Sequence, residues 1–151
     1  LDALSDGRLT VGLGVGARED DFTAVAAPFH RRGKRFDAQL EIMQRIWSGQ
    51  PLSEETGLIG PRPVQPTGPE IILGGVSPTA IRRIGRWGNG YIAETTGPER
   101  AEKLFRLAEE AWQEASRPGK PLLLAAMLPS TLTLLSEPVT PFSIITPSQD
   151  Q

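Results

Sequence analysis

Apolar runs alternate with amphipathic segments along most of the chain. Short apolar runs bounded by Gly or Pro predict four strands, at residues 7–16, 70–73, 91–93 and 121–127. Between them, apolar residues recur at three- and four-residue spacing, which predicts helices over 36–47, 78–87 and 98–115. Acidic residues at 19–21 suit the start of a shorter helix. Strands separated by helices favour right-handed βαβ crossovers, and hence an α/β fold with a parallel sheet.

Two segments depart from this alternation. Residues 50–69 contain five prolines and predict a long connection without regular structure. Residues 128–151 contain four prolines and eight Ser or Thr, so we expect an irregular C-terminal tail that is poorly ordered or foreign to the fold. A Ser/Thr/Pro-rich interaction tail is the alternative. The predicted folded domain is therefore 1–127.

Composition excludes several classes of protein. A net charge of −2 and a pI near 5.5 give no reason to expect nucleic acid or an anionic membrane as partner. Without cysteine, the chain has no disulfide, thiolate nucleophile or Cys-ligated metal, and it suits a reducing cytoplasm. We see no signal peptide and no apolar run long enough to span a membrane. A single histidine, His30, cannot build a Ser/His/Asp triad or a His-based metal cluster, so the catalytic residues stay unknown and the chemistry would come from a cofactor.

Three glycines at a spacing of two mark the first strand. Because side chains alternate between the faces of a strand, Gly12, Gly14 and Gly16 are predicted to leave one face bare. Bulky residues from neighbouring strands of a tapering barrel could fill that space. The other candidates are a closely approaching backbone or a flat ligand.

The second strand runs into a turn, Gly74-Gly75-Val76-Ser77-Pro78, that suits an anion. Glycines let a ligand approach the backbone, and the helix predicted after Ser77 offers unpaired N–H groups and a positive dipole end. Ser77 is a candidate helix N-cap or a hydroxyl donor to the anion. The same residues can also make a merely structural turn. Both glycine motifs fall at carboxyl ends of strands, where α/β folds bind their ligands.

Other polar motifs are less informative. The glycines do not fit GxGxxG, and no phosphate-binding GxxxxGK[ST] loop is present. The basic run of Arg31, Arg32, Lys34 and Arg35 reads as a solvated helix start or as an ion-pair partner of the acids at 19–21, in preference to a phosphate contact. We interpret His30 as a surface or edge residue.

Five blocks, in this order, resemble the bacterial luciferase-like flavin-dependent monooxygenase family. They are LSDGRL and VGLGVG at 4–9 and 11–16, PF, RG and IWSG at 28–29, 32–33 and 46–49, PVQP at 63–66, IILGG at 71–75 with Ser77-Pro78, and RWGNGY at 86–91. The resemblance covers residues 1–127. It implies the last four βα units of a (β/α)8 TIM barrel that binds FMN or the deazaflavin coenzyme F-420 and acts on a small-molecule substrate.

The resemblance also implies site residues. Gly14, Val15 and Gly16 would lie by the cofactor, and Gly74, Gly75 and Ser77 near its phosphate end. The family's substrate and proton-transfer residues fall largely in the first half of the barrel, so this chain resembles a truncated oxidoreductase whose open sheet edges require a homo-oligomer, a complementary half-barrel or its own tail.

Two alternatives remain at this stage. One is a non-catalytic barrel remnant, a phosphate- or flavin-binding module without turnover. The other is a doubly wound nucleotide-binding domain, which would carry helices on both faces of its sheet.

Overall fold

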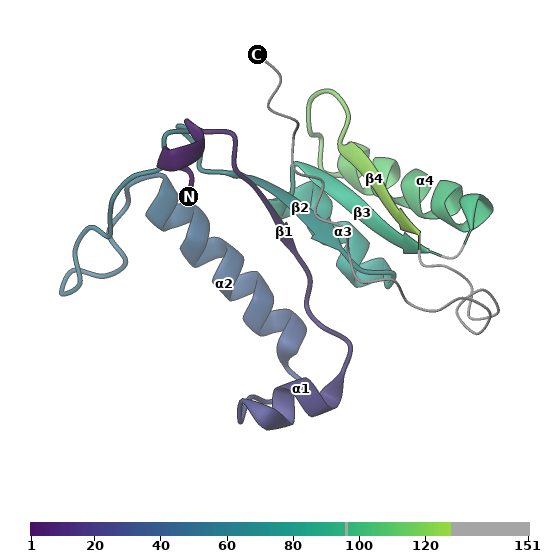
Figure 1. Cartoon of the computed structure of the whole chain (residues 1–151), viewed down its shortest axis with the longest axis horizontal. Helices are drawn as coiled ribbons and strands as arrows, with labels where there is room; N and C mark the ends of the chain where they lie inside the picture. The colour runs from purple at the N-terminus through teal and green to yellow at the C-terminus, as the bar shows by residue number, and fades with distance from the viewer. Residues whose placement is uncertain (96, 128–151) are drawn as a thin grey trace, which may run out of the picture.

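The computed structural model describes residues 1–95 and 97–127, which form one parallel sheet and its helices (Figure 1). The predicted tail at 128–151 lies outside the described residues. Neighbouring strands pair in parallel and in chain order: β1 (Thr10–Leu13), β2 (Glu70–Gly74), β3 (Gly90–Thr95) and β4 (Leu122–Met127). All four strands were predicted. β3 extends two residues beyond its apolar centre because Glu94 and Thr95 continue the ladder with β4.

The predicted helices are confirmed, with shifts at their ends. The helical segments are a short 3-10 turn (Ala3–Ser5), α1 (Glu19–Ala24), α2 (Arg32–Trp47), α3 (Pro78–Trp87) and α4 (Pro98–Glu114). Pro occupies the first position of both α3 and α4, where its missing N–H costs no hydrogen bond. The first turn of α2 is polar, so apolar periodicity alone placed its start four residues late, at Phe36. Residues 50–69 contain no helix or strand, as predicted.

The first predicted strand is wrong in its extent. β1 covers only four residues, and the rest of the 7–16 run lies outside it. Gly7 has a φ of +74° and Gly16 a φ of +85°, so the chain turns at both ends of the run. Positive φ values cannot continue a β-ladder, which needs extended backbone. Gly14 and Gly16 therefore follow the strand and do not belong to it.

The core lies between the sheet and its helices. Side-chain alternation sends one set of strand residues toward α3 and α4, which lie against the same face of the sheet in Figure 1. α2 adds Leu40, which is fully buried. The strand and helix residues that form this buried cluster are Leu40, Ile71, Leu73, Ile81, Ile84, Trp87, Tyr91, Ala93, Leu104, Ala108, Ala111 and Trp112.

The opposite face of the sheet has no helix over it among the described residues. Gly12, Ile72 and Ile92 lie on this face by register, with Leu122 and Leu124 on β4. Leu122 is 49% and Leu124 40% exposed, which is unusual for leucines of a parallel sheet. One-sided cover and sequential strand order fit a segment of a barrel. They contradict a doubly wound sheet, in which helices cover both faces.

An ion pair links α2 and α3. Arg83 Nε donates to Asp37 Oδ1 at 2.6 Å and Arg83 Nη2 to Asp37 Oδ2 at 3.1 Å, which gives the two-pronged geometry that carboxylates form with arginine. The Arg83 side chain is only 11% exposed, so solvent screens this pair less than a surface pair.

Gly85 sets how closely α3 and α4 approach. A Cβ added there would lie 2.5 Å from the Ala111 carbonyl oxygen and 2.7 Å from the Ala115 Cβ. We expect Gly85→Ala to lower the free energy of unfolding by about 1–3 kcal/mol through overpacking, although alanine is the better helix former by about 1 kcal/mol.

Urea unfolding measures this difference. The control is Arg82→Ala, an exposed position on the same helix, which should stay within about 0.5 kcal/mol of the parent chain. A Gly85→Ala chain more stable than the parent would contradict the close packing of α3 on α4.

Candidate functional site

Register brings the two predicted glycine motifs together. Leu13, the last residue of β1, pairs with Leu73, so Gly14 and Gly74 leave their strands side by side. A Cβ built on Gly74 would lie 3.9 Å from the Leu13 carbonyl oxygen, which confirms that the backbones are adjacent. The segments 14–16 and 74–77 therefore share the carboxyl edge of the sheet, although almost sixty residues separate them in the chain.

The glycines of the first motif have two different structural roles. A Cβ added to Gly12 or Gly14 meets no atom within 4 Å, so no bulky neighbour among the described residues fills this space. At Gly16 a Cβ would lie 3.2 Å from the Phe22 ring, and the positive φ favours glycine there. Gly12 and Gly14 thus leave room, whereas Gly16 makes a turn. The prediction that all three share one strand face is wrong, because only Gly12 lies within β1. Val15, between Gly14 and Gly16, is half-buried.

Arg32 anchors this segment from the start of α2. Its Nε donates to the Gly16 carbonyl oxygen at 3.2 Å, and its Nη1 donates to the Phe29 carbonyl oxygen at 3.3 Å. The guanidinium also lies 3.8 Å from the centre of the Phe29 ring, a cation–π contact. Sequence reasoning placed Arg32 in a solvated basic run and missed this contact with the candidate site.

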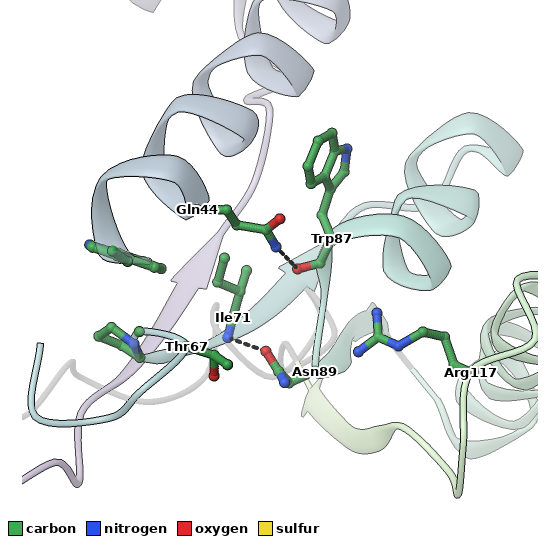
Figure 2. Close-up of a pocket in the computed structure, with 9 residues that line it drawn as sticks. Gln44, Thr67, Ile71, Trp87, Asn89 and Arg117 are labelled. Carbon is green, nitrogen blue, oxygen red and sulfur yellow. Dashed lines mark hydrogen bonds between the residues drawn. The ribbon is translucent and has the colours of Figure 1, made fainter. Parts of the chain in front are cut away.

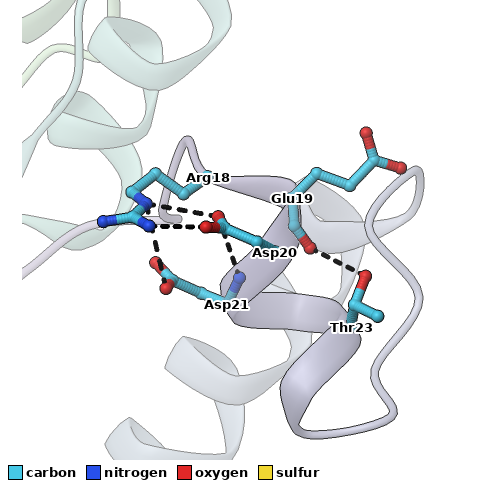
Figure 3. A network of polar contacts seen from close by, with 5 residues as sticks. All are labelled: Arg18, Glu19, Asp20, Asp21 and Thr23. Carbon is cyan, nitrogen blue, oxygen red and sulfur yellow. Dashed lines mark hydrogen bonds and ion pairs between the residues drawn. The ribbon is translucent and has the colours of Figure 1, made fainter.

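The acids at 19–21 were considered as ion-pair partners of the basic run at 31–35, but two of them pair with Arg18. Figure 3 shows Asp20 and Asp21 around Arg18, and the hydrogen bond from Arg18 lowers the pKa of the Asp20 carboxyl. Within the described residues, no member of the basic run at 31–35 forms an ion pair with these acids, so that interpretation is wrong. His30 is exposed and meets the edge of Phe29.

The turn after β2 has the geometry of a helix start. Ser77 has extended backbone, and its Oγ accepts a hydrogen bond from the Ala80 N–H at 3.2 Å, so it is the N-cap of α3. Gly75 has a φ of +135°, and a Cβ there would lie 2.7 Å from that of Ala80. The backbone N–H groups of Val76 and Ser77 have no hydrogen-bond partner in the described part of the chain. Two donors at the positive end of a helix suit an anion.

Tyr91 fixes this turn from the core. Its hydroxyl donates to the Gly75 carbonyl oxygen at 2.8 Å, and its side chain is 1% exposed. Burial raises the pKa of the Tyr91 phenol, which the charge of Arg100 partly offsets, so the hydroxyl keeps its proton at neutral pH. Sequence reasoning quoted Tyr91 only as part of the RWGNGY block. Its pairing with Leu73 places it on the helix side of the sheet, but no sequence signal indicates the Gly75 contact.

A pocket of about 280 Å³ lies at the opposite end of the sheet (Figure 2). There the Ile71 N–H donates to Asn89 Oδ1 at 3.0 Å, and Gln44 Nε2 donates to the Trp87 carbonyl oxygen at 3.5 Å. These polar groups hold the backbone where β2 and β3 begin. In barrel folds that end carries stability and the carboxyl end carries chemistry, so this pocket is not the candidate site.

Residues 1–95 and 97–127 contain neither a metal-binding cluster nor a membrane-spanning helix. There is no group of three or more His, Asp or Glu side chains that could hold a metal ion. No helix there is both long and apolar enough to cross a membrane.

Sequential parallel strands with helices on one face define this protein as a segment of a (β/α) barrel. The family model described as luciferase-like monooxygenase matches residues 1–133. The chain therefore belongs to the luciferase-like monooxygenase family.

Two curated relatives come from Mycobacterium tuberculosis strain H37Rv. Uncharacterized protein Rv0953c is 27% identical over 132 residues, which cover 83% of this chain and 46% of the relative. Uncharacterized protein Rv0940c is 30% identical over 126 residues, covering 74% of this chain and 41% of the relative. The chain thus spans less than half the length of the curated relatives it matches.

Solved structures share the fold. The monooxygenase RslO1 from Streptomyces bottropensis superposes with a TM-score of 0.67 at 26% identity, covering 79% of this chain and 39% of that one. The coenzyme F420-dependent tetrahydromethanopterin reductase from Methanopyrus kandleri gives 0.62 at 21% identity, covering 76% and 39%. The oxygenating constituent of 3,6-diketocamphane monooxygenase from Pseudomonas putida, solved with FMN, gives 0.64 at 20% identity, covering 79% and 39%. The predicted partial TIM barrel is confirmed.

The Gly75 turn can be tested by substitution. We expect Gly75→Ala to lower the free energy of unfolding by about 2–4 kcal/mol, because it adds both an unfavourable φ and a collision with Ala80. Gly57→Ala is the matched control, since Gly57 also has a positive φ, +66°, but a Cβ there meets nothing within 4 Å. It should cost about 1 kcal/mol. Equal losses in chemical denaturation would show that the turn has room for a side chain.

Proposed function

We propose that this chain binds a flavin-type cofactor, FMN or coenzyme F-420, at the carboxyl edge of β1 and β2, as part of an oxidoreductase for a small-molecule substrate. The observation that carries the proposal is the pairing of two features at one edge. Open space beside Gly12 and Gly14 lies next to the backbone donors of Val76 and Ser77, which have no partner in the described chain. A flat ring with a phosphate group needs both.

The residues present fit such a group. Gly14, Val15 and Gly16 would line its ring, since glycine lets a planar ligand lie against the backbone. Gly74 and Gly75 would let the phosphate approach, and Ser77 would donate its hydroxyl hydrogen while its oxygen caps α3. When bound, the cofactor supplies hydride transfer or, as a reduced flavin, oxygen activation. This chain's own residues bind and orient the group.

Relatives support both cofactor types. One structure of similar fold was solved with FMN, and another is a coenzyme F420-dependent reductase. The site residues of this chain do not distinguish the two, because backbone N–H groups contact any phosphate in the same way. We therefore propose the shared chemistry and let the titration separate the cofactors.

A second half-barrel would complete the site. The bare face of the sheet carries exposed leucines on β4, and β1 and β4 are edge strands of the described sheet. Such edges and faces pair with further strands in a closed barrel. We propose that a complementary half-barrel or a second copy of the chain covers them and contributes the residues that contact substrate.

A cofactor titration tests the binding proposal. We expect FMN or coenzyme F-420 to change fluorescence on mixing, with a Kd below about 1 mM. Oxidation of NAD(P)H or of a substrate then separates an oxidoreductase from the alternative, a cofactor-binding module without turnover. An unchanged signal with both cofactors up to about 1 mM would refute the proposal for this chain.

Gly14→Val tests whether the open space is where the ring lies. A Cβ at this position meets no atom of the described residues within 4 Å, so the melting temperature of the valine variant should stay within about 2 °C of the parent. The cofactor Kd should nevertheless rise at least about tenfold, because the side chain occupies the ligand's place.

The matched control is Thr10→Val, an exposed position on the same face but at the start of β1. Its cofactor affinity should match that of the parent chain. If Gly14→Val also binds the cofactor as the parent does, the ring does not lie there.

A further inference from the structure

Tyr91 makes an unusual contact for a core residue. Its ring belongs to the buried cluster between sheet and helices, yet its hydroxyl reaches out of β3 to the turn that follows β2. A phenylalanine would fill nearly the same core volume. The hydroxyl therefore has one described role, the 2.8 Å hydrogen bond that it donates to the Gly75 carbonyl oxygen.

The hydrogen bond to the Gly75 carbonyl also fixes the direction of the next backbone N–H group, that of Val76. In a planar trans peptide, the carbonyl of one residue and the N–H of the next point in opposite directions. Tyr91 holds the Gly75 carbonyl toward the helix layer, so the Val76 N–H must point away from that layer. No described group accepts from this N–H, and the Val76 residue is 51% exposed.

Gly75 makes the orientation possible. Its φ of +135° is open to glycine but strained for residues with a Cβ, and the added atom would collide with Ala80. Peptide groups beside such glycines can flip when nothing holds them. A buried donor on the carbonyl selects one of the two orientations, because the flipped state would leave the phenol hydrogen unpaired in the core.

We propose that Tyr91 is the positioning residue of the anion-binding turn, holding the Gly75–Val76 peptide so that the Val76 N–H faces the cofactor phosphate. This inference rests on the proposed function, since it assigns a role toward the phosphate of the same site. Tyr91 itself does not contact the cofactor. It acts through the peptide group that it holds.

Tyr91→Phe tests the assignment by removing only the hydroxyl. Affinities are measured for FMN and for riboflavin, which lacks the phosphate, and in the same way for coenzyme F-420 and its phosphate-free deazaflavin. We expect the Kd of the phosphorylated ligand to rise about tenfold in Tyr91→Phe, while that of the phosphate-free ligand changes less than about twofold. A purely structural role would weaken both ligands equally.

Ile84→Val controls for lost core stability. Ile84 is fully buried in α3 but donates nothing to the turn, so this variant should keep the parent's preference for the phosphorylated ligand. A second measurement needs only the parent chain: inorganic phosphate should shift the amide resonance of Val76 in a ¹⁵N-resolved NMR titration. That readout serves even if Tyr91→Phe does not fold.

The outcomes distinguish a failure of the Tyr91 assignment from a failure of the proposed cofactor binding. If the parent binds FMN no better than riboflavin, and coenzyme F-420 no better than its phosphate-free form, the anion-binding turn is wrong and the Tyr91 role falls with it. If the parent discriminates and Tyr91→Phe discriminates equally, only the Tyr91 assignment is overturned. If phosphate shifts the amide resonance of Ser77 but not that of Val76, the Tyr91 assignment is also overturned.

Discussion

The register between β1 and β2 is the constraint on which the candidate site depends. With Leu13 opposite Leu73, both strands end at one level and their glycines emerge together. A slip of one residue would turn Leu13 out of the core and Gly12 into it, because side chains alternate along a strand. Burial of Ile71 and Leu73, at 2% and 1% exposure, fixes β2 in place, and β1 inherits its alignment from β2. Core packing thus decides where the two glycine motifs meet at the carboxyl edge of the sheet.

The two faces of this sheet differ in how tightly they are packed. On the helix side, buried side chains form the core cluster, and even a methyl group at Gly85 would collide with α4. On the other side, Gly12 and Gly14 leave space that no described atom fills. The same strands therefore form a packed core on one face and leave open space on the other.

Sequence patterns predicted the fold better than the details of the site. Helical spacing and Pro at helix starts placed α3 and α4, and the glycine-rich turns located the carboxyl edge. Periodicity could not predict the end of β1, because Val15 continues the apolar alternation while Gly16 turns the backbone. Arg32 and Tyr91 were missed for another reason: each donates to the carbonyl of a distant glycine, and partners in space leave no spacing signal. Asp20 and Asp21 pair with Arg18, which lies close to them in the sequence, and not with the basic run at 31–35.

The turn at Gly75–Ser77 presents main-chain atoms, and this has a consequence for how such a protein diverges. An N–H group persists whatever side chain the residue carries, proline excepted, so Val76 can be replaced without removing a donor. What must be kept is the shape of the turn, which depends on Gly75 and on the core behind it. Alanine scanning of this turn would therefore report distortion of the backbone rather than loss of side-chain contacts.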